Sequence, residues 1–162
     1  MSSKKIKTIE EITEVSERLR KEGKIIVTTN GSFDLLHSAH LNLLEKAKKE
    51  GDVLIVLLNS DYSIKKMKGE NRPILSENER VRILSAIVYV DYITIFNDDK
   101  PLFLLEKIKP QKHVKGGAFT PERIKEEEEL LTNWNGKFKN FKLEEGYSTT
   151  NIIDKILKDK ER

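Results

Sequence analysis

Short apolar runs alternate with amphipathic segments along the chain. Residues 25–29 and 53–58 are rich in apolar and β-branched side chains, as expected of strands buried on both faces of a parallel sheet. Between them, Leu41, Leu44 and Ala47 recur at helical spacing. This alternation repeats about five times and predicts an α/β, Rossmann-like fold of three layers, in which helices cover both faces of a five-stranded, mainly parallel sheet.

Caps and helix breakers predict the other element boundaries. Capping boxes at residues 8–11 and 76–79 each begin a helix, and Gly23 ends the first of these. The second helix is expected to have Val81, Leu84, Ile87 and Val88 on its apolar side. Pro101 and Pro121 suit the first turns of two further helices, and residues 148–157 form a last one. Further strands are expected at residues 92–96, 112–115 and 137–143. We expect the polar, lysine-rich segment 59–73 to be a loop.

The composition fits one heavily charged domain. The 162 residues include 30 basic and 27 acidic ones, which gives a net charge of +3, and 37% are hydrophobic. Because the two signs of charge are mixed along the chain, a nucleic-acid-binding surface is not indicated. We expect a single domain, residues 1–162, with an N-terminal helix in residues 1–23 and the core in residues 24–158.

Several features are missing from the sequence. No apolar run approaches the roughly 20 residues that a membrane-spanning helix needs, and the segment MSSKKIKTIEE lacks the apolar core of a secretory signal. Absence of cysteine excludes disulfides, thiolate metal sites and cysteine nucleophiles. We therefore expect a cytoplasmic protein with neither nucleic acid nor membrane as a partner.

Two of the three histidines, His37 and His40, lie where the strand at residues 25–29 passes into the next helix. The free N–H groups and the dipole of a helix N-terminus favour an anion, so two imidazoles at this point suggest a phosphate site. A pair of surface histidines or half of a metal site are the alternatives, although only His113 remains to complete histidine ligation.

The segment containing these histidines resembles a known signature. Residues 31–40, GSFDLLHSAH, are similar to the GxFDxxHxGH motif of the cytidylyltransferase-like nucleotidyltransferases. The segments NSD, KGENRP, ER, VD, VKGG and GYSTT follow in the order seen in the heptose 1-phosphate adenylyltransferases of the lipopolysaccharide and S-layer sugar pathway. The resemblance covers about residues 25–156.

The resemblance implies an enzyme that transfers AMP from ATP to a sugar 1-phosphate, with heptose 1-phosphate as the expected acceptor. Pyrophosphate would leave by direct in-line displacement, so positioning and electrostatic stabilisation would supply most of the catalysis. Mg²⁺ is the implied cofactor, and because it would be held mainly by the triphosphate, no protein metal ligand is named. A homodimer is also implied.

The family motifs indicate site residues in this sequence. The catalytic candidates are His37, His40 and a lysine, with Lys68 ahead of Lys66. The nucleotide-binding candidates are Gly31, Ser32, Phe33, Arg80, Lys115, Gly116, Gly117, Ser148, Thr149 and Thr150. Asp34 and Arg72 are candidates for the acceptor phosphate or for support of the phosphate loop.

Some of these motifs also have a purely structural interpretation. The lysines could belong to a solvated loop, Arg80 could be an exposed helical residue, and the hydroxyls from Ser148 onward could simply cap a helix. Two departures from the family pattern, Ala39 for glycine and Ala118-Phe119 for Asp-Tyr, leave other functions open. These are a CTP-dependent glycerol-phosphate-type cytidylyltransferase, an FMN adenylyltransferase and a catalytically silent nucleotide-binding regulatory protein. Ser38, where the heptose enzymes usually have proline, is expected to cap its helix.

Overall fold

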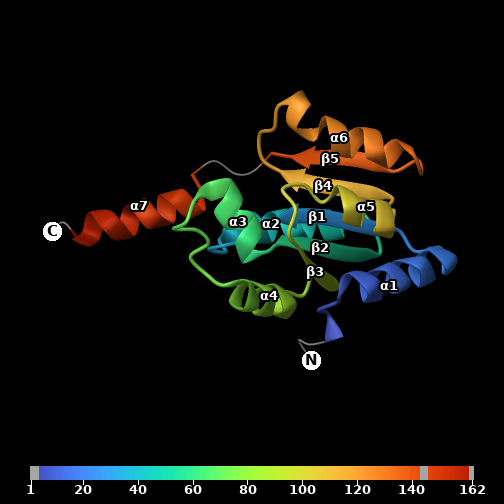
Figure 1. Cartoon of the computed structure of the whole chain (residues 1–162), viewed down its shortest axis with the longest axis horizontal. Coiled ribbons are helices and arrows are strands. Elements are labelled where there is room, and N and C mark those ends of the chain that lie inside the picture. Colours follow the sequence, from blue (N-terminus) through green and yellow to red (C-terminus); the bar gives the residue numbers. More distant parts are fainter. Residues whose placement is uncertain (1–3, 143–145, 161–162) are drawn as a thin grey trace.

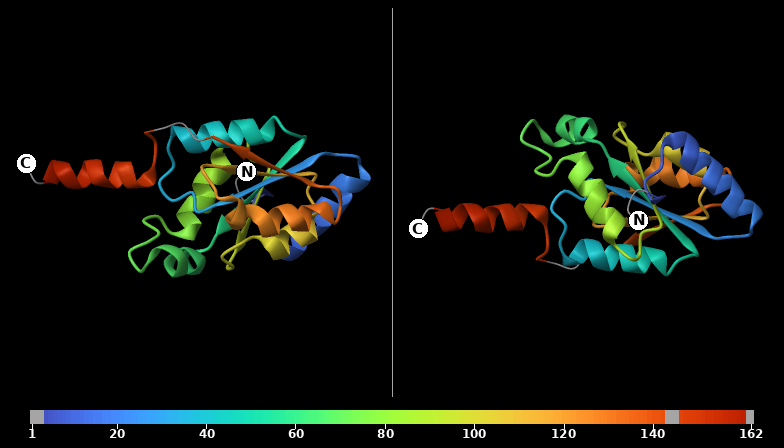
Figure 2. Two further views of the ribbon diagram at one scale, coloured as in Figure 1. Left: turned by 90° about the horizontal axis from the view of Figure 1, so that it is seen from above. Right: turned by 90° about the horizontal axis from the view of Figure 1, so that it is seen from below.

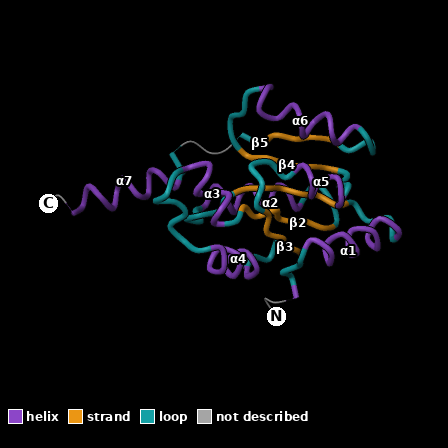
Figure 3. Tube along the Cα trace, viewed as in Figure 1, coloured by secondary structure: helices purple, strands orange, loops and turns teal. Residues whose placement is uncertain are grey.

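The computed structural model describes residues 4–142 and 146–160. Its strands form one parallel sheet in the order β3-β2-β1-β4-β5, at the centre of the molecule (Figures 1 and 3). The strands are β1 (Ile26–Gly31), β2 (Val53–Asn59), β3 (Tyr92–Phe96), β4 (Lys112–Gly116) and β5 (Lys137–Phe141). The predicted α/β fold is confirmed. Residue 143 of the predicted last strand lies outside the described residues.

Helices pack on both faces of this sheet. The helices are α1 (Ile9–Lys21), α2 (Ser38–Lys48), α3 (Asp61–Lys68), α4 (Glu77–Ala86), α5 (Leu102–Ile108), α6 (Pro121–Thr132) and α7 (Thr149–Lys160). Leu44 of α2 and Leu84 of α4 belong to the core on one face. Ile12 of α1 and Leu105 of α5 belong to the core on the other face. The strand side chains alternate between these two cores, as the pleat of a sheet requires.

Both predicted capping boxes are present. The Thr8 hydroxyl accepts a hydrogen bond from the Glu11 N–H group, and the Glu11 carboxylate accepts one from the Thr8 N–H group. Ser76 and Glu79 form the same reciprocal pair at the start of α4. These bonds satisfy N–H groups that have no partner within the first turn of a helix.

The outer edge of β3 is covered by the segment before α1. The Ile93 N–H group donates to the Lys5 carbonyl at 2.9 Å, and the Lys7 N–H group donates to the Ile93 carbonyl at 2.9 Å. The opposite edge strand, β5, exposes Lys137 and Lys139. Charged side chains on an edge strand oppose pairing with another sheet.

Three local expectations were wrong. Part of segment 59–73 is helix α3, which begins with the Ser60 hydroxyl accepting from the Ser63 N–H group at 3.1 Å. Ser38 is the first residue of α2, and the cap position is His37, which makes no side-chain cap hydrogen bond. Val88 was expected on the buried side of α4, but α4 ends at Ala86 and Val88 is 79% exposed.

Helix α7 extends away from the rest of the molecule, with only its first turn near the sheet (Figures 1 and 2). Within the described ranges, no helix has both the length and the apolar character needed to cross a bilayer.

Candidate active site

A cleft of about 490 Å³ lies where the carboxyl ends of β1, β2 and β4 meet the start of α7. The strand order changes direction beside β1, since β2 and β3 follow on one side of it and β4 and β5 on the other. Ligands of open α/β sheets bind outside the carboxyl ends of the strands at such a point. The cleft wall contains these predicted site residues: Gly31, Ser32, Phe33, Asp34, His37, His40, Lys68, Arg72, Lys115, Gly116, Ser148, Thr149 and Thr150.

The two signature histidines stack on each other in this cleft. Their ring centroids are 3.9 Å apart with an interplanar angle of 25°, and the Phe33 ring lies 5.3 Å from that of His40. Burial, with help from His37 and Lys68, lowers the pKa of His40 to about 4, and burial lowers the pKa of His37 as well. Both imidazoles are therefore neutral at pH 7, and each carries one N–H group that can donate.

The loop between β1 and α2 has a tightly determined shape. Phe33 is buried and has a positive φ of 43°, which is uncommon for a residue with a side chain. A Cβ atom on Gly31 would come within 3.1 Å of the Phe33 ring. A side chain at this position would have to displace the ring by a few tenths of an ångström, so Gly31 favours the close approach that places the loop beside the histidines.

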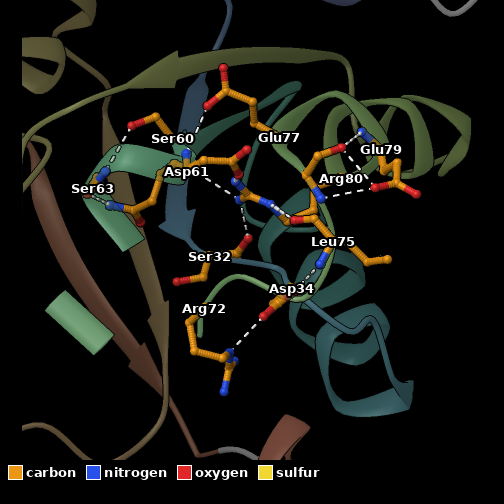
Figure 4. Close-up of polar contacts among 12 residues, drawn as sticks. Ser32, Asp34, Ser60, Asp61, Ser63, Arg72, Leu75, Glu77, Glu79 and Arg80 are labelled. Atoms are coloured by element: carbon orange, nitrogen blue, oxygen red, sulfur yellow. Dashed lines mark hydrogen bonds and ion pairs between the residues drawn. The ribbon is translucent and has the colours of Figure 1, made fainter. Parts of the chain in front are cut away.

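Asp34 joins this loop to the segment before α4. Its carboxylate accepts hydrogen bonds of 2.9 Å from the N–H groups of Ile74 and Leu75 and from Nε of Arg72 (Figure 4). Burial raises the pKa of Asp34, but these bonds outweigh it and hold the pKa below its ordinary value. Asp34 is thus an ionised anchor that orients Arg72 at the cleft wall.

Arg80, a predicted nucleotide-binding residue, is not among the residues of the cleft wall. Its side chain is fully buried, and Nη1 donates to the carbonyls of Ser32 at 2.7 Å and Asn59 at 2.8 Å (Figure 4). Nη2 donates to Asp61 at 2.8 Å, and Nε donates to the Leu75 carbonyl at 3.0 Å. The guanidinium group therefore holds together the loops after β1 and β2, and its binding of a nucleotide stays a prediction.

The structure also separates the two candidate lysines, which lie on α3. Lys68 is in the cleft wall, and its pKa is lowered by desolvation and then by Arg72, although solvent still reaches the side chain. Lys66 lies outside the cleft wall and pairs with Asp99 at 3.5 Å. Lys68 is therefore the lysine with access to a ligand in the cleft.

Gly117 and the two substituted alanines lie outside the cleft wall. The Gly117 N–H group donates to the Phe141 carbonyl at 3.0 Å, and its own carbonyl accepts from the Asn140 side chain at 2.8 Å. Ala39 is 1% exposed, so its methyl group packs inside the protein. Ala118 is exposed, and the cleft wall next to it is formed by Phe119.

The start of α7, near the C-terminus of the chain, forms part of the cleft wall. The Ser148 hydroxyl accepts from the Asn151 N–H group at 3.0 Å and so caps the helix. The Thr149 hydroxyl donates to the Leu35 carbonyl at 3.4 Å, which ties α7 to the histidine loop. Free N–H groups and hydroxyls at this helix start can bind a phosphate chain.

Sequence reasoning missed a group of charged residues at the β4 side of the cleft. Lys100, Arg123 and Glu127 all belong to the wall, and Lys115 forms an ion pair with Glu127 at 2.5 Å. Burial lowers the pKa of Lys115, and Glu127 opposes that shift. No local signal distinguishes Glu127, because it is one of four consecutive glutamates in residues 126–129.

Comparison with known families agrees with this geometry. A family model described as Cytidylyltransferase-like matches residues 28–155, from β1 into α7. This chain belongs to the cytidylyltransferase-like family. The resemblance predicted from the histidine signature is therefore confirmed, and membership makes the chain a nucleotidyltransferase.

Relatives within this family share the whole of the core. The bifunctional protein HldE of Geobacter metallireducens is 46% identical over 157 residues, which are 97% of this chain and 32% of the relative. The bifunctional protein HldE of Campylobacter jejuni subsp. doylei is also 46% identical over 157 residues, with the same two shares. The chain thus spans about a third of the length of the relatives that it matches.

Two solved structures share the fold of this cytidylyltransferase-like chain. The lipopolysaccharide core biosynthesis protein from Thermoplasma volcanium matches with a TM-score of 0.62 and 26% identity, over 78% of this chain and 100% of that one. Pantoate-beta-alanine ligase from Francisella tularensis matches with a TM-score of 0.64 and 17% identity, over 97% of this chain and 79% of that one. At that identity, the second likeness concerns the fold alone.

Proposed function

We propose that this protein transfers AMP from ATP to a sugar 1-phosphate, with heptose 1-phosphate as the acceptor. The observation that carries the proposal is the meeting of the stacked pair His37 and His40, the cations Lys68 and Arg72, and the start of α7 in one cleft. The order of the sequence motifs, the relatives named HldE and the Thermoplasma relative named for lipopolysaccharide core biosynthesis support the choice of acceptor.

In the proposed reaction, an oxygen of the acceptor phosphate attacks the α-phosphorus of ATP. The new P–O bond forms as the bond to the bridging oxygen of the β-phosphate breaks, and pyrophosphate leaves. Negative charge gathers on the nonbridging oxygens of the α-phosphate in the transition state. Neutral His37 and His40 each offer an N–H donor to these oxygens, in a site that is already partly desolvated.

The other cleft residues divide between the two substrates. Lys68 and Arg72 lie on the β2 side and supply positive charge for the acceptor phosphate. Ser148, Thr149 and Thr150 begin α7 and supply hydroxyl and N–H donors for the triphosphate. Asp34 contributes by orienting Arg72, since its carboxylate accepts a hydrogen bond from Nε of the guanidinium group.

Mg²⁺ is part of this proposal, bound mainly through the phosphates. Within residues 4–142 and 146–160, no group of three or more histidine, aspartate or glutamate side chains is arranged to hold a metal ion. Asp99 in the cleft wall offers a carboxylate to a phosphate-bound ion or to its water. When bound, Mg²⁺ would neutralise the charge of the triphosphate and the leaving pyrophosphate.

The proposal is tested by pyrophosphate release with Mg²⁺ over a grid of substrates. ATP, CTP, GTP and UTP are each combined with heptose 1-phosphate, glycerol 3-phosphate and FMN. Turnover is expected with ATP and heptose 1-phosphate. Turnover only with CTP and glycerol 3-phosphate would replace both the nucleotide and the acceptor. Turnover only with ATP and FMN would keep AMP transfer and replace the acceptor. Nucleotide binding without any turnover would favour a silent binding protein. The homodimer stays a prediction, which sedimentation of the purified chain would test.

A further inference from the structure

Glu127 on α6 is a buried carboxylate with one unused oxygen. The residue is 0% exposed although it forms part of the cleft wall. Its Oε1 atom accepts from Nζ of Lys115 at 2.5 Å, whereas Oε2 has no hydrogen-bond partner among the described residues. An unsatisfied buried acceptor destabilises a protein, so its presence in a ligand cleft calls for a partner that arrives with the ligand.

The surrounding charges restrict what this partner can be. Lys115 already pairs with Glu127, and Arg123 and Lys100 lie close enough to Lys115 to lower its pKa. Lys100 itself pairs with Glu126 at 3.0 Å, but three cations against two carboxylates still leave a net positive charge, which disfavours a metal ion or a ligand ammonium group. A phosphate would be repelled by the carboxylate itself and offers no proton. The remaining ligand group is a neutral O–H or N–H donor.

The position of Glu127 relative to the sheet indicates which substrate supplies that donor, and this step rests on the proposed function. His37 follows β1, in the centre of the strand order. Lys68 and Arg72, assigned above to the acceptor phosphate, follow β2 on one side of it. Lys115 and Glu127 lie at the end of β4 and on α6, on the other side. In-line transfer at the histidines then leaves the β4 side to the nucleoside of ATP.

We propose that Glu127 is a specificity-determining residue whose Oε2 atom accepts a hydrogen bond from the nucleoside of ATP. The donor is a ribose hydroxyl or the exocyclic amine of adenine, which share the required chemistry. Lys115 holds the carboxylate in place through Oε1. Because Glu127 is 0% exposed, a hydrogen bond from the nucleoside to its carboxylate forms in surroundings of low dielectric, which strengthens the bond.

Binding of ATP and its analogues in the absence of acceptor tests the proposal by calorimetry. The ligands are ATP, 2′-deoxy-ATP, 3′-deoxy-ATP, inosine triphosphate and inorganic tripolyphosphate, all with Mg²⁺. The variant is Glu127→Gln, and the matched control is Glu128→Gln, an exposed neighbour outside the cleft wall. Glu127→Gln is expected to bind ATP about 10–100-fold more weakly, the range for a hydrogen bond to a charged group.

Two further results are expected. The wild-type protein and Glu128→Gln discriminate between ATP and the one analogue that lacks the donor, and Glu127→Gln loses that discrimination. Tripolyphosphate, which has no nucleoside, binds the wild-type protein and Glu127→Gln with the same affinity. If Glu127 only supported the fold, Glu127→Gln would weaken the binding of ATP and of tripolyphosphate by the same factor and would still discriminate between ATP and its analogues.

Three results would overturn the proposal. One is unchanged ATP affinity in Glu127→Gln relative to Glu128→Gln, and another is equal weakening of ATP and tripolyphosphate. The third concerns the wild-type protein alone, so it can be observed even if Glu127→Gln does not fold. The wild-type protein would then bind ATP and the three nucleoside analogues with equal affinity, or would not bind ATP at all. If the wild-type protein discriminates between ATP and its analogues as expected but transfers no AMP, the proposed function is contradicted and the role of Glu127 in nucleoside binding is not.

Discussion

The imidazoles of His37 and His40 stack on each other in the cleft, with their ring centroids 3.9 Å apart. Because burial lowers the pKa of His40, that ring is neutral at pH 7 and can donate a hydrogen bond to a phosphate through one N–H group. They lie one helical turn apart, with His37 as the cap of α2 and His40 in its first turn. In the part of the chain that the structure describes, Nδ1 of each ring has no hydrogen-bond partner. No hydrogen bond at Nδ1 from a described residue therefore fixes the tautomer of either ring.

Removal of either imidazole should reduce the chemical step. His37→Ala and His40→Ala are each expected to lower kcat by about 10²–10³-fold, the usual effect of losing one transition-state donor. The thermal midpoint of His37→Ala should stay near that of the wild-type protein, because His37 makes no cap hydrogen bond. Steady-state pyrophosphate release and thermal unfolding measure the two quantities. An unchanged kcat in both variants would remove the histidines from the mechanism.

The two lysines on α3 provide a matched comparison. Lys68→Met should lower kcat/KM for the acceptor by about 10²-fold or more, because Lys68 is in the cleft wall and a charge-assisted bond to phosphate is lost. Lys66→Met should change kcat/KM by no more than about threefold, since Lys66 has only an exposed ion pair with Asp99. Equal effects of the two substitutions would contradict the assignment.

Arg80 should affect stability rather than nucleotide affinity. Arg80→Lys removes most of the hydrogen bonds to Ser32, Asn59 and Leu75 from a fully buried position, which should lower the free energy of unfolding by about 3 kcal/mol. Urea unfolding measures this loss. If Arg80 instead bound a phosphate, the variant would unfold normally and lose ATP affinity.

His113 predicts how stability depends on pH. Burial, with help from Lys115, lowers the pKa of His113 in the folded protein to about 3 from 6.5, and its Nδ1 lies 2.7 Å from the Thr28 hydroxyl. Between those two values the unfolded chain binds a proton that the folded protein does not, so stability falls as the pH decreases below 6.5. The loss for this residue is about 1.4 kcal/mol per pH unit.

Urea unfolding of the wild-type protein and His113→Gln at pH 7 and pH 5 measures this dependence. His113→Gln is expected to be less stable at pH 7 but to lose less stability on going to pH 5. His40, whose pKa is also lowered, contributes to the remaining dependence in both proteins. Equal losses in the two proteins would mean that His113 is protonated in the folded state.

Local patterns in the sequence predicted the strands, the capped helices and the residues that meet in the cleft. The apolar run of β2 and the capping box at Thr8 are local signals, and parallel strands bring their carboxyl ends together whatever the intervening sequence. Helix α3 was missed because only Ser63 and Ile64 are buried on it, so it has almost no apolar period.

The roles of two charged residues could not be predicted because their partners are distant in the sequence. Arg80 is satisfied by carbonyls 21 and 48 residues away, and only the fold brings them together. Glu127 is distinguished from its neighbouring glutamates only by its burial against Lys115. Polar networks of this kind depend on tertiary packing and have no periodic pattern in the sequence.

The most direct test of the central claim follows the α-phosphate. The protein is incubated with Mg²⁺, heptose 1-phosphate and ATP labelled at the α-phosphate, and the products are separated. AMP transfer predicts that the label enters a nucleotide sugar in equal amount to the pyrophosphate released, and that this product is absent with His37→Ala. Label that stays in ATP, or that appears as free AMP or ADP, would contradict the account.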